Sequence, residues 1–199
     1  MSYTEIFGFD KDGNAYSQAD IENAWRGAMA IWNILEDKYL PPYVPEYAKK
    51  IGITTAQDCE RILKYKPTRC TVVMEENAMK EIWDLANKND VSDTDRICLF
   101  TTFDRCLVKK EDIPKVIQAF RSFEGETSLK EQADVLEQMY LDDGCIAVGW
   151  NQTSVSCDTW INFGGYDEET EESIPYNCIT GAEHYWLFDE FHLNEKEAE

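Results

Sequence analysis

The sequence predicts an α+β protein in which an N-terminal hairpin and several helices precede a mostly antiparallel sheet in the C-terminal half. Three observations support this class. Of the 199 residues, 43% are hydrophobic, which is enough for a packed core; apolar residues recur at helical spacing through the first two thirds; and short β-rich segments follow residue 145. We expect one domain over residues 1–199. A polar segment at 87–95 offers an alternative division into a helical subdomain, 1–92, and an α+β subdomain, 93–199.

The chain begins with a predicted hairpin. Asp12-Gly13 supplies the positive-φ residue of a tight turn between two apolar stretches. A helix is then expected over residues 17–39, with Ser17 as its cap and Pro41-Pro42 after its end. Its apolar positions recur every three or four residues and are Ile21, Trp25, Ala28, Trp32, Leu35 and Tyr39.

Four further helices are predicted in the middle of the chain, at residues 54–65, 75–88, 112–123 and 128–143. Pro114 occupies a tolerated first-turn position, and Ser128 with Glu131 has the spacing of a capping box. The β-branched segment 102–108 predicts a strand.

After residue 144 the pattern changes to short strands joined by turns. Strands are expected at residues 145–150, 158–163, 176–180 and 184–191.

The charge is strongly negative and unevenly distributed. The net charge is −20; residues 1–120 hold 20 acids and 16 bases, whereas residues 121–199 hold 19 acids and 3 bases. Such a surface repels phosphate backbones and anionic lipids and favours basic partners. We therefore expect no direct binding to nucleic acid or membranes.

The seven cysteines are scattered singly, with no CxxC pair, and the N-terminus lacks the pattern of a signal peptide. This predicts reduced thiols and a cytoplasmic protein.

The segment around Asp10, Asp12 and Gly13 has two chemical interpretations. A calcium loop in this register would place Gly8 and Ala19 where the first and last ligands belong, which argues against it. The Asp-x-Asp-Gly sequence also resembles the nucleophile motif of haloacid-dehalogenase-like phosphatases. However, the later acidic pair Asp142-Asp143 precedes its strand instead of following it, so a plain hairpin turn is favoured.

Histidine and cysteine chemistry is the next alternative. His184 and His192 share one face of the predicted last strand but would lie about 26 Å apart, too far for one metal ion. Cys145, Cys157 and Cys178 lie in the same region as His184, yet no motif marks a nucleophile. We expect no cofactor, no metal site and no catalytic residue.

Aromatic side chains alternate with amides and hydroxyls over residues 150–185, which is a pattern that can form a small-ligand pocket. A small-ligand-binding protein or an enzyme using this aromatic, cysteine-rich region is therefore the alternative function.

The acidic residues of the C-terminal region are the main candidate site. Closely spaced carboxylates can imitate the charge density of nucleic acid, and nearby aromatic side chains can anchor an interface. The candidate partner-binding residues are Tyr166, Asp167, Glu168, Glu169, Glu171, Glu172, Tyr176, Glu183, Tyr185, Trp186, Asp189 and Glu190.

Basic residues concentrate between positions 49 and 69. This patch is either a solvated helix face or a surface that meets the acidic region of a second copy; the second interpretation predicts a homodimer.

Five stretches resemble a family of small acidic proteins from phages and mobile elements of Gram-positive gut bacteria: residues 7–16, 23–42, 101–104, 123–133 and 150–165. No activity is assigned to that family, so the resemblance transfers no functional residue. It implies a setting in which small acidic proteins often inhibit host defence nucleases. We therefore expect a non-enzymatic interaction protein that binds a basic protein surface, such as the nucleic-acid channel of a CRISPR effector or restriction enzyme.

Overall fold

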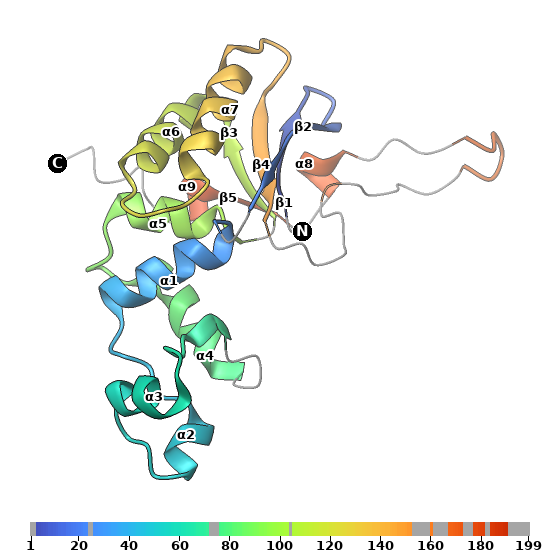
Figure 1. Cartoon of the computed structure of the whole chain (residues 1–199). Coiled ribbons are helices and arrows are strands. Elements are labelled where there is room, and N and C mark those ends of the chain that lie inside the picture. The colour runs from blue at the N-terminus through green and yellow to red at the C-terminus, as the bar shows by residue number, and fades with distance from the viewer. Residues whose placement is uncertain are drawn as a thin grey trace.

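A computed structural model describes most of the chain, and its elements form a sheet layered against helices (Figure 1). The described residues are 3–23, 26–71, 76–103, 105–152, 160, 167–172, 177–181 and 184–190. In chain order the elements are β1 (Tyr3–Phe9), β2 (Ala15–Glu22), α1 (Ala28–Tyr39), α2 (Glu46–Lys50), α3 (Ala56–Leu63), η1 (Arg69–Thr71), α4 (Glu76–Trp83), η2 (Asp84–Asn87), α5 (Asp93–Phe100), β3 (Cys106–Lys109), η3 (Lys110–Asp112), α6 (Ile113–Ser122), α7 (Leu129–Leu141), β4 (Ala147–Asn151), α8 (Cys178–Gly181), β5 (Tyr185–Trp186) and α9 (Leu187–Glu190).

The sheet has the strand order β2-β1-β4-β3-β5. The first four strands pair antiparallel, and β5 pairs with β3 in parallel, so the sheet is mixed. The α+β class is confirmed. The expected confinement of the sheet to the C-terminal half is wrong, because the N-terminal hairpin supplies two of its strands.

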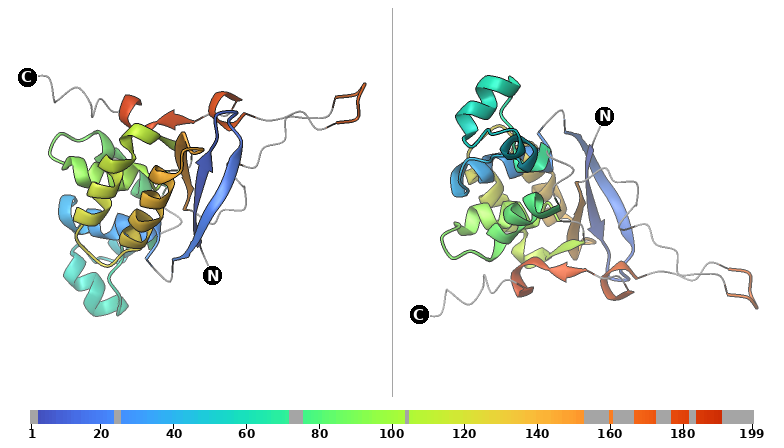
Figure 2. Two further views of the ribbon diagram at one scale, coloured as in Figure 1. Left: turned by 90° about the horizontal axis from the view of Figure 1, so that it is seen from above. Right: turned by 90° about the horizontal axis from the view of Figure 1, so that it is seen from below.

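Two apolar clusters cover the two faces of the sheet. Along β4 the side chains alternate: Val148 and Trp150 join the large cluster under the helices, whereas Ala147 joins a smaller cluster with Phe9 and Trp160 on the other face. Figure 2 shows helices α1, α5, α6 and α7 gathered on one side of the sheet. The large cluster also joins Ile31 and Ile82 to Phe120, so the core crosses the candidate boundary near residue 92.

The predicted hairpin is confirmed, with Gly13 at φ +78° in its turn. The helix expected from Ser17 is wrong in its first part, because residues 17–22 extend β2 and α1 begins only at Ala28. Ile21 still enters the same core as Ile31. The apolar spacing was therefore compatible with either state, and the backbone pairing with β1 decided for a strand.

The middle helices are confirmed in position but not in every cap. Thr55 caps α3 by accepting a hydrogen bond from the Asp58 amide, 3.1 Å away. The expected capping box at Ser128 is not formed; its hydroxyl instead donates to the carbonyl of Arg26 at 3.1 Å. The strand expected at 102–108 is shorter, because α5 continues to Phe100 and β3 starts at Cys106.

The C-terminal strands are confirmed only in part. The strand expected at 145–150 is β4, whereas residues 178–181 form the helical turn α8 instead of a strand. Asn177 explains the difference, since its side-chain oxygen accepts hydrogen bonds from the amides of Ile179 and Thr180, both at 2.9 Å. The last expected strand is reduced to Tyr185–Trp186, followed by α9. The strand expected at 158–163 lies outside the described residues apart from Trp160.

Candidate functional site

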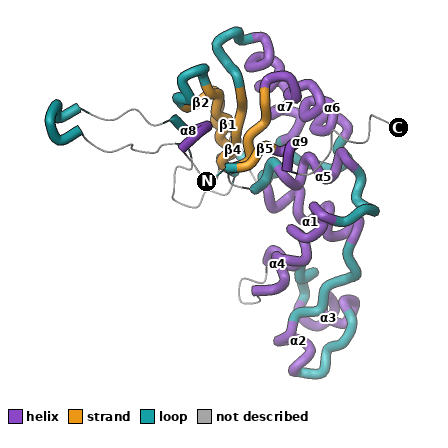
Figure 3. The backbone as a smooth tube through the Cα atoms, turned by 180° about the vertical axis from the view of Figure 1, so that it is seen from behind, coloured by secondary structure: helices purple, strands orange, loops and turns teal. Residues whose placement is uncertain are grey.

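The acidic segment 167–172 lies well away from the helices and the sheet in every view (Figures 1, 2 and 3). Its five acidic side chains, those of Asp167, Glu168, Glu169, Glu171 and Glu172, are all exposed. The segment is a closed turn, in which the Asp167 amide donates to the Glu172 carbonyl at 3.0 Å and the Glu171 amide donates to the Asp167 carbonyl at 2.9 Å. The Asp167 carboxylate also accepts from the amides of Glu169 and Thr170, at 2.8 and 3.1 Å.

The other candidate residues with described side chains pack against the sheet. Tyr185 is half-buried and its hydroxyl donates to the Phe100 carbonyl at 3.1 Å. The Trp186 ring lies under the Lys109 ammonium, 5.5 Å from the ring centroid, and the same ammonium pairs with Asp189 at 2.5 Å. These contacts hold β5 and α9 against β3, so these three side chains stabilise the fold itself.

The candidate residues that the structure describes therefore do not share one surface. The acidic segment 167–172 lies apart from β5 and α9 in the three figures. Tyr166, Tyr176 and Glu183 lie outside the described residues, as does the side chain of Glu190.

The Asp10 carboxylate is hydrogen-bonded within its own turn. Its carboxylate accepts hydrogen bonds from the amides of Asp12 and Asn14, at 2.8 and 3.0 Å, and from the Asn14 side chain at 2.9 Å. These bonds, led by that from the Asn14 side chain, hold the pKa of Asp10 below its usual range. Because β1 pairs antiparallel with both its neighbours, Asp10 does not sit at the end of a parallel strand, as the phosphatase interpretation requires.

Three of the described thiols belong to buried cysteines that pack as hydrophobic residues. Burial raises the pKa of Cys98, Cys106 and Cys178, which keeps these thiols protonated. The half-buried His184 packs edge-on against Trp186, with the ring centroids 5.7 Å apart. His192 and Cys157 lie outside the described residues.

No group of three or more His, Cys, Asp or Glu side chains within the described ranges is arranged to hold a metal ion. A recess lined in part by Leu107, Trp186 and Phe188 encloses essentially no space for a ligand. It is therefore far smaller than the several hundred Å³ of a typical ligand pocket. No helix among the described elements has the length and apolar character needed to cross a membrane.

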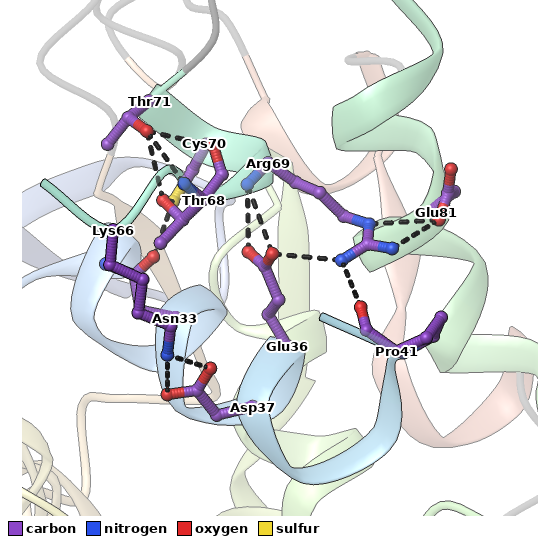
Figure 4. Close-up of polar contacts among 10 residues, drawn as sticks. All are labelled: Asn33, Glu36, Asp37, Pro41, Lys66, Thr68, Arg69, Cys70, Thr71 and Glu81. Carbon is purple, nitrogen blue, oxygen red and sulfur yellow. Dashed lines mark hydrogen bonds and ion pairs between the residues drawn. The ribbon is translucent and has the colours of Figure 1, made fainter. Parts of the chain in front are cut away.

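Arg69, which the sequence predicts only as part of a basic patch, is the buried centre of a polar cluster (Figure 4). Its guanidinium pairs with Glu36 of α1 and Glu81 of α4, both at 2.9 Å, and donates to the Pro41 carbonyl at 3.2 Å. Its backbone amide also donates to the Glu36 carboxylate. The Tyr43 ring covers the same guanidinium, 4.9 Å from the ring centroid. No local sequence motif predicts this cluster, because its members come from segments far apart in the chain.

The Arg69 cluster has a clear role in the architecture. The chain leaves α1 near Pro41 and returns at Arg69, so the cluster holds together both ends of the segment that carries α2 and α3.

Comparisons of the chain with models of protein families, with curated proteins and with solved structures found no match.

Proposed function

We propose that the chain is a non-enzymatic interaction protein that binds a basic surface of a protein partner through the acidic segment 167–172. The observation that carries this proposal is the exposed turn with five carboxylates in six residues, set apart from the core. None of these carboxylates forms an ion pair with a described residue. Their charges are thus available to a partner.

A nucleic-acid-binding channel is the partner surface that this charge density fits. Duplex DNA carries one negative charge per about 1.7 Å of its axis, so its binding channels are lined with Lys and Arg. The net charge of −20 adds long-range attraction to such a channel. The resemblance to proteins of phages and mobile elements favours a defence nuclease, such as a CRISPR effector or a restriction enzyme.

The proposal is tested by competition. A panel of purified defence nucleases is titrated with labelled nucleic acid, with and without this protein, at low salt. We expect the protein to displace nucleic acid from at least one of them. If nucleic-acid binding by every member is unchanged, the proposal is wrong.

Two variants of equal net charge distinguish the contribution of the segment 167–172 to binding from that of the net charge of the whole chain. The segment variant replaces Glu168, Glu169, Glu171 and Glu172 by Gln and keeps Asp167, whose carboxylate closes the turn. The control variant makes the same replacement at four exposed glutamates of the body, Glu22, Glu111, Glu124 and Glu126. Exposed ion pairs contribute about 0.2–1 kcal/mol each, so the loss of four should weaken competition by the segment variant by about fourfold to several hundredfold, and the control should stay close to wild type.

A further inference from the structure

The exposed apolar side chains of the described residues are concentrated at two ends of the molecule. Of ten exposed large hydrophobic residues, seven belong to two short segments. Four of them, Tyr47, Ile51, Ile62 and Tyr65, lie in the segment 44–66, which carries α2 and α3 and is called the head here. The other three, Tyr140, Leu141 and Ile146, lie in the segment 140–146, which comprises the end of α7 and the loop to β4 and is called the crown.

The head is a small projecting unit with a basic surface. Its own core consists of Ala48, Ile53 and Cys59, separate from the main core, with Val44 and Leu63 packed around it. Ile51 is 67% exposed. The segment holds five bases and three acids, in a chain whose net charge is −20. Lys50 and Lys64 are exposed and form no ion pair with any described residue. The head thus presents apolar and positive groups together.

The crown presents the complementary combination. Leu141 is 72% exposed, and Asp142 and Asp143 beside it are exposed as well. The Asp142 carboxylate accepts hydrogen bonds from the Gly144 amide at 2.8 Å and from the Tyr16 hydroxyl at 3.3 Å, which fixes the segment. Asp143 forms no ion pair within the described part of the chain. Apolar and negative groups are thus presented side by side.

The two surfaces lie at opposite ends of the molecule. In Figure 1 the head is at the bottom and the loop from α7 to β4 is at the top, and Figure 3, viewed from behind, shows the same separation. One chain therefore does not bring its own head to its own crown.

We propose that the head of one copy docks on the crown of a second copy. Lys50 and Lys64 would face the crown aspartates, and Ile51 and Ile62 would cover Leu141 and Ile146. Two copies lying antiparallel make this contact twice, which gives a closed two-fold dimer. This orientation also sets the most positive segment of one copy against a negative segment of the other, so it lowers the repulsion between two highly acidic chains.

The oligomeric state of the full chain tests this inference. Sedimentation velocity at physiological ionic strength, over rising protein concentration, is expected to show a species of twice the mass of one chain. Three variants at exposed positions should weaken it by about tenfold or more: Lys50→Glu with Lys64→Glu, Asp143→Lys, and Leu141→Ser. Circular dichroism and thermal unfolding check that each variant is folded.

Mixing provides the sharper test. The Lys50→Glu/Lys64→Glu chain and the Asp143→Lys chain each present like charges to themselves, but each complements the other, so an equimolar mixture should recover the dimer. A wild-type chain that stays monomeric at the highest concentration reached, or variants that associate as tightly as wild type, would overturn the inference. The segment variant with four Gln replacements should dimerise normally, so failure of the dimer and failure of the proposed partner binding are distinguishable.

Discussion

Replacing Arg69 by methionine should destabilise the protein strongly, because it leaves the Glu36 carboxylate buried without its cation. The side chains of Arg69 and Glu36 are 4% and 6% exposed. Breaking such a pair by removing one partner costs about 3–5 kcal/mol. The backbone amide of residue 69 still donates to Glu36 at 3.0 Å, so the lower end, about 3 kcal/mol, is expected. For a chain of this size that corresponds to a fall in Tm of about 6–12 °C.

The same arginine offers an internal control. Its second partner, Glu81, is 51% exposed, so Glu81→Gln should cost less than about 1 kcal/mol. The double variant Glu36→Gln/Arg69→Met removes the unpaired buried charge of the Glu36 carboxylate but keeps a side-chain oxygen that accepts from the backbone amide of residue 69. It should therefore be more stable than Arg69→Met alone.

Urea unfolding followed by tryptophan fluorescence gives the three free energies. Amide hydrogen exchange shows which part of the chain loses stability. In Arg69→Met, protection should fall most in the head, at the amides of Ala48 and Lys64, and least in β1 and β4. Equal costs for Arg69→Met and Glu81→Gln, or no recovery in the double variant, would refute the reasoning.

Two further predictions concern the core and the response to pH. A Cβ at Gly149 would lie 2.9 Å from Trp160 and 3.1 Å from Leu107. Gly149→Ala should therefore lower the free energy of unfolding in urea by about 1–3 kcal/mol, whereas Gly144→Ala at an exposed position should lower it by well under half of that. Similar losses for the two variants would contradict the packing of Trp160 on the sheet. Burial alone would raise the pKa of Asp95, but hydrogen bonds from Lys38, Tyr39 and Ser92 hold it below its usual range. Its folded pKa is thus below its unfolded pKa, so its contribution to stability is present above the unfolded value of about 3.9 and is lost as the pH falls through the folded value. Asp95→Asn should flatten the acid limb of a stability-against-pH curve, and an unchanged limb would refute the assignment.

The sequence predicted the parts of the fold that depend on neighbours in the chain. The Asp12-Gly13 turn and the amphipathic helices expected at 54–65 and 112–123 are local features, and each is present. The errors at residues 17–22 and 178–181 arose where pairing with the hairpin partner β1 or a single Asn side chain decided between two backbone states.

The candidate site was predictable in composition but not in arrangement. The acidic character of residues 167–172 is visible in the sequence, whereas the pairing of Asp189 with Lys109 depends on a strand contact between remote segments. The Arg69 cluster could not be predicted for the same reason, since Glu36, Arg69 and Glu81 meet only in the folded chain. The crown was missed because its apolar residues look like the end of a helix and the start of a strand.

The salt dependence of partner binding tests the central claim most directly. For a nuclease identified by the competition assay, its affinity for this protein is measured at several salt concentrations for wild type, the segment variant and the control variant. The affinity of wild type and of the control variant should fall steeply with salt, and that of the segment variant should be weaker and fall less steeply, because fewer interface charges are screened. Equal slopes and affinities for the segment and control variants would show that net charge alone attracts the partner and would contradict a binding site at residues 167–172.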